Sequence, residues 1–310
     1  MNASHKKIMS TLKSYVRAGK LPLMLVLFPF SLGKDRIGLE LFRERINLSI
    51  QRTLTRRYYG KKISYDYNSR QYKNVPDNQV IWFMWLQGIK QAPKLCQANF
   101  NYLKRNFSSQ VKLITAKNLF DYVSLPNFII DKWQKGFISN THFSDIIRIQ
   151  LLCTYGGTWI DSTVIAKKEF VLNLPEFSIP QTYGPGKNGH SIPVSNWFIH
   201  AKKGNPFLMR VRELLFYYWQ GNNHALDYFI FHHFLVIASR EMSGYLNRVA
   251  PLDNTLPHFL MLKMRQTEIS IQELKCYLEK FQLMKFTNKL ENDTERKNYQ
   301  KLVKLLEEMR

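Results

Sequence analysis

Two acidic side chains and one basic side chain stand close together near the middle of this chain, on either side of two adjacent glycines. Asp145 and Arg148 are spaced i, i+3, so on a helix both project from the same side. Gly156-Gly157 supplies the backbone freedom that ends a helix, and 158–160 is typical of a short buried strand. Asp161 follows at the carboxyl end of that strand, where open α/β sheets bind ligands. A carboxylate there can hold a divalent cation, which can in turn hold a diphosphate.

The order of these residues resembles a known family. The motif S-D-x-x-R at 144–148, an apolar helix, Y-G-G at 155–157 and then Asp161 resemble the DxD-type glycosyltransferases of the capsular polysaccharide synthesis family. That family is related to mannosyltransferase-like and clostridial-toxin-like sugar transferases. Further segments resemble it in the expected order: 80–88, 92–95, 195–206, 227–233 and 283–289. The resemblance therefore implies a GT-A type, Rossmann-like nucleotide-sugar-binding sheet flanked by helices.

Asp161 is the residue that the resemblance places at the metal and nucleotide site. A DxD motif would put a second Asp at the position of Thr163, which offers a hydroxyl oxygen without charge. The resemblance implies a divalent cation, Mn²⁺ or Mg²⁺, at Asp161 and Thr163, bound more weakly or with help from another ligand. It also implies that Asp145 and Arg148 contact the donor sugar. The alternative interpretations are a strand-end cap for Asp161 and a surface salt bridge for Asp145 and Arg148.

Several other residues are candidates for the nucleotide-sugar site. Trp82 and Trp85 lie on opposite faces of a regular strand, so only one of them can stack on the base. We expect Gln87 and Gly88 to shape the pocket mouth, and Asp227 to contact the sugar or act as a base on the acceptor side. The remaining residues of the nucleotide-sugar site that the resemblance implies are Ser144, Gly157, Asn196 and Lys285.

The charge of the chain points to an anionic partner. Lys and Arg number 45 against 23 Asp and Glu, which gives a net charge of +22. The sequence has no helix-turn-helix, zinc-finger or ribonucleoprotein signature, so we expect an anionic membrane surface rather than nucleic acid. The apolar run 21–30 is too short to span a bilayer; it either lies in the membrane interface or packs on the catalytic domain. Three widely separated cysteines fit a reducing cytosol.

Strand patterns at 79–86, 111–114 and 158–160 alternate with helix patterns, among them 93–105, 127–134, 142–155 and 226–240, which predicts an α/β sheet covered by helices. Turn signals predict a linker over 65–78 and a loop over 182–190, which is either a lid or an ordinary surface connection.

We expect a basic helical extension over 1–76, a catalytic domain over 77–290 and an amphipathic helix over 291–310. The resemblance implies hexose transfer, with retention, from a nucleoside-diphosphate sugar, taken as UDP-linked, to a saccharide. The saccharide acceptor would be a lipid-linked oligosaccharide at the inner, cytoplasmic face of a bacterial plasma membrane. Two alternatives stay open: a transferase acting on a protein or a teichoic-type polymer, and a basic anionic-polymer-binding protein with a degenerate site.

Overall fold

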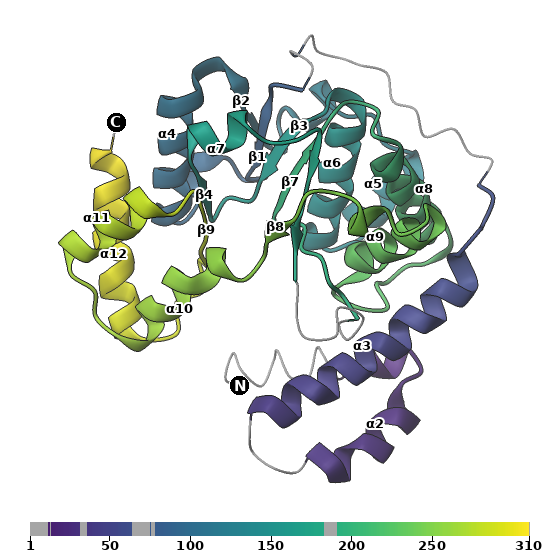
Figure 1. The fold of residues 1–310 in the computed structure, drawn as a ribbon. Helices are drawn as coiled ribbons and strands as arrows, with labels where there is room; N and C mark the ends of the chain where they lie inside the picture. Colours follow the sequence, from purple (N-terminus) through teal and green to yellow (C-terminus); the bar gives the residue numbers. More distant parts are fainter. Residues whose placement is uncertain are drawn as a thin grey trace.

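A mixed five-stranded sheet forms the centre of the protein (Figure 1). The computed structural model describes residues 12, 14–31, 36–63, 75, 78–182 and 191–309. The strands are β1 Ile81–Met84, β2 Val111–Ile114, β3 Gly157–Ile160, β5 Phe177–Ser178 and β7 Phe198–Ala201, in the order β2-β1-β3-β7-β5. The pairs β1–β2 and β1–β3 are parallel, whereas β7 is antiparallel to β3 and β5. The predicted α/β class, a sheet with parallel strands flanked by helices, is confirmed.

Helices cover both faces of this sheet, and each face has its own hydrophobic core. The helices on one face are α5 Asn127–Gln134, α6 Asn140–Tyr155, α8 Pro206–Gly221 and α9 Ile230–Glu241. Those on the other face are α4 Lys94–Phe107, α7 Lys168–Leu172, α10 Phe259–Gln266, α11 Ile271–Lys280 and α12 Asp293–Glu308. Because side chains alternate along a strand, Trp82 enters the first core while Ile81 and Phe83 enter the second.

Two glycines explain why α6 and β3 can follow each other so closely. Gly156 and Gly157 have φ angles of +69° and +90°, which residues with a Cβ rarely adopt. A Cβ at Gly157 would lie 2.3 Å from the Val80 carbonyl oxygen, so β3, which leads to Asp161, can approach the start of β1 only without a side chain there. Ser139 caps the other end of α6 by accepting a hydrogen bond from the backbone N–H of His142.

Two short sheets join distant parts of the chain. β4 Val164–Ala166 pairs antiparallel with β9 Leu283–Lys285, and β6 Pro180–Gln181 pairs parallel with β8 Leu252–Asp253. The first pair places Lys285 opposite Val164, so a residue from the far end of the chain lies beside the segment that follows β3.

Short 3₁₀ helices occur in several connections of the described chain. They are η1 Phe28–Ser31, η2 Ile89–Gln91, η3 Ser108–Gln110, η4 Leu119–Asp121, η5 Tyr245–Asn247 and η6 Leu256–His258.

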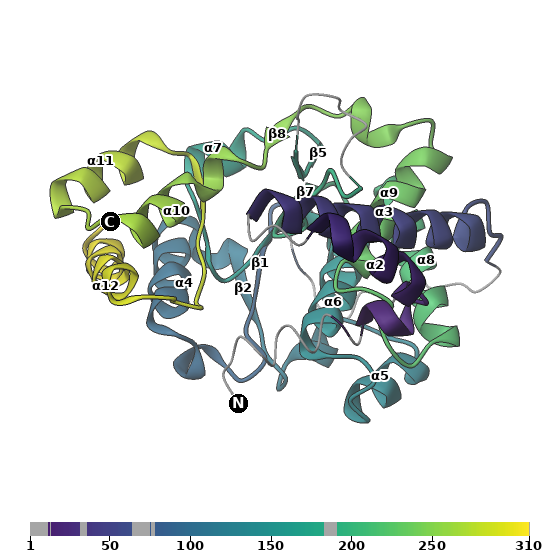
Figure 2. The same ribbon diagram turned by 90° about the horizontal axis from the view of Figure 1, so that it is seen from below.

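The N-terminal segment packs on the rest of the protein through one long helix. α3, Arg36–Tyr58, buries Ile46, Ile50 and Leu54 in the core that also contains α9. α2, Leu21–Leu27, lies beside α3 (Figure 2). The sequence left two possibilities for 21–30, packing on the protein or lying in a membrane interface. One side of α2 does pack on the protein, because Leu23, Met24 and Leu27 contact this core. The opposite side of α2 and η1 leaves large apolar side chains exposed: Leu21, Leu25, Val26, Phe28 and Phe30.

No helix within the described residues is long and apolar enough to cross a membrane. The predicted linker over 65–78 and the turn-rich loop over 182–190, which the sequence suggests as a lid, lie almost entirely outside the described residues.

Candidate active site

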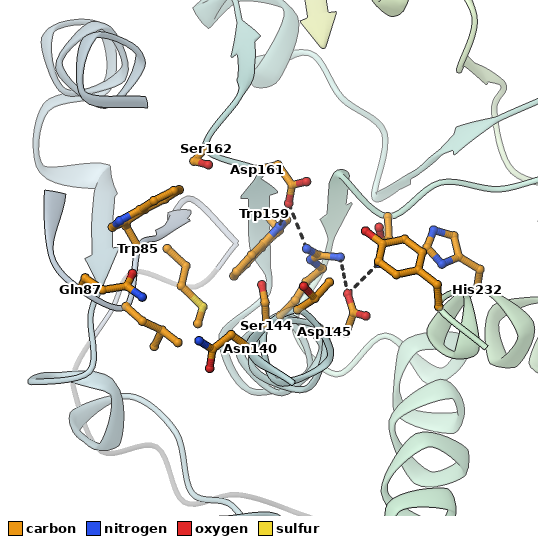
Figure 3. A pocket seen from close by; sticks show the side chains of 15 residues that line it. Trp85, Gln87, Asn140, Ser144, Asp145, Trp159, Asp161, Ser162 and His232 are labelled. Carbon is orange, nitrogen blue, oxygen red and sulfur yellow. Dashed lines mark hydrogen bonds and ion pairs between the residues drawn. The ribbon is translucent and has the colours of Figure 1, made fainter. Parts of the chain in front are cut away.

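A cavity of about 380 Å³ opens at the carboxyl ends of β1 and β3. From β1 the chain leaves towards β2 on one side, and β3 lies on the other side, so the cavity sits where the strand order reverses. Ligands bind at this position in open α/β sheets. Figure 3 shows Trp85 and Gln87 on one side of the cavity, His232 on the other, and Trp159, Asp161 and Asp145 between them.

Arg148 joins the two carboxylates that the sequence predicted for this site. One guanidinium nitrogen donates to Asp145 Oδ1 at 2.9 Å and the other donates to Asp161 Oδ1, also at 2.9 Å. The guanidinium also lies over the Trp159 ring, 4.7 Å from its centroid. Only 5% of the Arg148 side chain is exposed, so this is not the surface salt bridge of the alternative interpretation. The Nε of Arg148 is buried without a hydrogen-bond partner among the described residues.

Further hydrogen bonds hold each carboxylate in place. Asn196 Nδ2 donates to Asp145 Oδ1 at 2.8 Å, and Trp159 Nε1 donates to Asp161 Oδ1 at 2.9 Å. The backbone N–H of Asp161 donates to the carbonyl of Trp197 on the neighbouring segment, which fixes the end of β3. The structure therefore brings Asp145, Arg148, Asp161 and Asn196 together, and Ser144 lines the same cavity.

The two residues expected to bind a divalent cation face an ammonium group. Lys285 Nζ donates to Thr163 Oγ1 at 2.7 Å and lies 3.5 Å from Asp161 Oδ2. Asp161 Oδ1 already accepts hydrogen bonds from Arg148 and Trp159. Among the described residues there is no group of three or more His, Cys, Asp or Glu side chains that could hold a metal. Mg²⁺ and Mn²⁺ prefer several oxygen ligands, so the arrangement does not fit the expected cation.

The two tryptophans of the first strand have different positions. Trp85 lines the cavity together with Gln87, so Trp85 is the tryptophan that stays a candidate for stacking on a base. Trp82 is fully buried instead, and its indole N–H donates to the Gly156 carbonyl at 2.9 Å. The proposed base-contacting role of Trp82 is therefore corrected to a core role. Gly88, with φ +90°, begins the turn into η2 beyond the cavity.

Two other predicted site residues lie away from the cavity. Asp227 is buried and accepts a hydrogen bond from His233, whose Nε2 lies 2.9 Å from Asp227 Oδ2. Its neighbours Tyr228 and His232 line the cavity in its place. Gly157 packs against Val80 at the start of β3, at the opposite end of the strand from Asp161. Asp227 therefore supports the site through a buried hydrogen bond to His233, and Gly157 supports it through the close approach of its backbone to Val80.

His232 is the main residue that sequence reasoning left out of the site. Burial lowers the pKa of His232 to about 4, so its imidazole is neutral at pH 7. Its Nδ1 is buried and has no hydrogen-bond partner within the described residues. Tyr228, Trp159, Asn140 and Ser162 also line the cavity. The only sequence signal for His232 was its place in the segment 227–233, because a single histidine in an apolar helix is usually part of the core.

The fold and the site together define an α/β protein with a cavity at the strand-order reversal of its sheet and an Asp–Arg–Asp ion-pair chain in the cavity wall. The model of the capsular polysaccharide synthesis protein family matches residues 39–304. The chain belongs to this family.

Two curated relatives are described as glycosyltransferases. The probable glycosyltransferase FCK3 of Fusarium pseudograminearum (strain CS3096) is 25% identical over 50% of this chain and 42% of its own length. The O-glycosyltransferase braB of Annulohypoxylon truncatum is 28% identical over 47% of this chain and 39% of its own length. The chain therefore spans about two fifths of these relatives. Both relatives are fungal, and the expected bacterial setting stays a prediction.

A solved structure, that of the PaToxG glycosyltransferase, aligns with 86% of this chain and 97% of its own chain. The sequence identity is 15% and the TM-score is 0.38.

Proposed function

We propose that this protein is a glycosyltransferase with a GT-A type fold that moves a hexose from a nucleoside-diphosphate sugar to a saccharide hydroxyl. The observation that carries the proposal is the ion-pair chain Asp145–Arg148–Asp161, of which Asp145 and Arg148 are buried, in a cavity at the carboxyl ends of β1 and β3. Family membership and two relatives described as glycosyltransferases support it. We take the donor to be UDP-linked and the reaction to retain the anomeric configuration, as the sequence resemblance implies.

Different residues of the cavity would bind the base, the diphosphate and the sugar of the donor. Trp85 is half-buried at the end of β1 and offers a ring face on which a nucleobase can stack, with Gln87 beside it. Arg148 presents guanidinium N–H groups to the diphosphate, whose charge increases as the bond to the sugar breaks. Asp145, held by Asn196, accepts hydrogen bonds from sugar hydroxyls.

His232 completes the acceptor side of the cavity. Its neutral imidazole lines the cavity and can form a hydrogen bond with the acceptor hydroxyl, whereas a pKa of about 4 makes it a weak base for removing the proton. His232 and Trp85 lie on opposite sides of the cavity (Figure 3), which leaves space for the sugar between them, next to Asp145 and Asp161.

Turnover of a panel of nucleoside-diphosphate sugars tests the proposal. We expect release of nucleoside diphosphate from one of these donors, and at least a 100-fold loss of kcat in Asp161→Ala and Asp145→Asn. Asp131→Asn is the matched control, because Asp131 is an exposed aspartate on α5. If folded protein releases product from none of the donors, with or without saccharide acceptors, the proposal is wrong and the anionic-polymer-binding alternative gains support.

We further propose that the acceptor is lipid-linked and that the protein binds an anionic membrane surface. The exposed apolar side chains of α2 and η1 include Phe30 at 85% exposure and Leu25 at 66%. Exposed arginines lie close by in the sequence on α3, among them Arg43 and Arg45. Of these two, Arg43 pairs with Glu40. Exposed apolar side chains in a basic segment are typical of an interfacial membrane contact.

Co-sedimentation with phosphatidylglycerol vesicles tests the membrane contact. Leu25→Ser/Phe30→Ser should reduce the bound fraction at least fivefold without changing turnover of a soluble acceptor. Leu172→Ser is the matched control, because Leu172 is also an exposed leucine, at 59%, and lies on α7, away from α2 and η1. Equal binding by all three proteins, or binding to neutral vesicles alone, would refute the proposed contact.

A further inference from the structure

We infer that the ammonium group of Lys285 takes the place of a divalent cation at this site, so that a nucleoside diphosphate binds without metal. The inference rests on the proposed function, because it concerns how the same site holds its donor. It departs from the sequence expectation that Asp161 and Thr163 bind Mn²⁺ or Mg²⁺.

The position of Lys285 carries the inference. Its Nζ is 2.7 Å from Thr163 Oγ1 and 3.5 Å from Asp161 Oδ2, which puts a positive charge between the two oxygens expected to bind the cation. Only 18% of the Lys285 side chain is exposed. The antiparallel pairing of β4 and β9 fixes its backbone, because Lys285 lies directly opposite Val164. Lys285 is therefore held at this point by the fold.

The remaining charges disfavour a metal ion in the same place. Arg148 binds the other oxygen of Asp161, so the carboxylate already faces two cationic side chains. A divalent cation would have to displace the Lys285 ammonium from Thr163 and then sit beside two positive charges. A hard cation also prefers more oxygen ligands than one carboxylate and one hydroxyl provide.

Lys285 has the donors that a phosphate group needs. An ammonium has three N–H groups, and among the described residues two acceptors are in reach, Thr163 and Asp161. Asp161 lines the main cavity, whereas Thr163 and Lys285 line an adjoining hollow that also contains Arg265 and Lys289. The ammonium thus lies at the border between the cavity and a basic hollow, where it can neutralise a diphosphate that enters from the cavity.

Calorimetric titration with UDP and GDP, each in EDTA and in Mn²⁺, tests the inference. For wild-type protein we expect the better-bound nucleotide to have the same Kd in both buffers, within twofold. Lys285→Met should weaken that binding at least 10-fold in EDTA, whereas Lys285→Arg, which keeps the charge, should recover most of it. Lys280→Met is the control, because Lys280 is an exposed lysine at the end of α11. Circular dichroism melting confirms that each variant is folded.

A gain-of-function variant makes the test sharper. Thr163→Asp/Lys285→Met restores a second carboxylate and removes the ammonium, so we expect nucleotide binding that needs Mn²⁺. Wild-type binding that EDTA abolishes and Mn²⁺ restores would overturn the inference and leave the transferase proposal intact. Folded wild-type protein that binds neither nucleotide in either buffer would overturn the proposed function, and the inference with it.

Discussion

Replacing Arg148 by methionine should destabilise the protein strongly. Arg148 is 5% exposed and neutralises two carboxylates, of which the Asp145 side chain is 8% exposed and the Asp161 side chain 27%. Removing one partner of a buried ion pair costs about 3–5 kcal/mol, since an uncompensated charge stays buried. Asp161 keeps Lys285 and is partly exposed, so the expected loss is near the lower end, about 3 kcal/mol.

Urea unfolding at pH 7, followed by circular dichroism, measures this loss. The matched control is Arg296→Met, because Asp293 and Arg296 form an ion pair at the same i, i+3 spacing on α12 with 85% and 56% exposure. We expect that control to lose no more than about 1 kcal/mol. Asp145→Asn in the Arg148→Met background should recover stability, because it removes one of the uncompensated charges. If Arg148→Met and Arg296→Met lose equal amounts, the argument from burial is wrong.

Three further predictions concern the backbone, the pH response and the base platform. Gly157→Ala should lose more than about 2 kcal/mol in urea unfolding because of its φ and its contact with Val80, whereas Gly204→Ala, with φ +67° and open space, should lose about 1 kcal/mol. Burial lowers the pKa of His232 to about 4, below its unfolded value, so protons bind preferentially to the unfolded chain between about pH 6.5 and 4. His232 should therefore contribute a fall of about 2 kcal/mol in the free energy of unfolding from pH 7 to pH 5, and His232→Asn should remove this contribution. Burial also lowers the pKa of His200 to about 4, so the rest of the fall should persist in that variant. Trp85→Ala should weaken UDP binding about 10-fold in calorimetry, with unfolding by urea nearly unchanged.

Much of the local structure followed from sequence patterns. The segments predicted as strand 111–114 and helix 127–134 coincide with β2 and α5, and the motif helix predicted over 142–155 is α6, which begins at Asn140. These elements depend on spacing, glycines and caps within one segment, so local reasoning was sufficient. The helix expected from 226 begins at Ile230 instead, because the preceding residues turn towards the cavity and the core.

The site was predictable only in part, because some of its residues are placed by local patterns and others by contacts between distant segments. The i, i+3 spacing of Asp145 and Arg148 and the strand-end position of Asp161 were visible in the sequence, and these three residues do form the centre of the cavity wall. Alternation showed that Trp82 and Trp85 face opposite ways, but which of them faces the cavity depended on where α6 and its neighbours pack.

Short-range patterns specified the class of fold, the motif helix and the acidic end of β3, because hydrogen bonding and side-chain periodicity act over a few residues. Packing between distant segments decided that Arg148 binds both carboxylates, that Asp227 turns to His233, and that Lys285 lies between Asp161 and Thr163. Such contacts depend on how β9 pairs with β4 and on how α9 packs on the core. No single segment contains that information, since each of these side chains takes its position from a backbone that other parts of the chain hold in place.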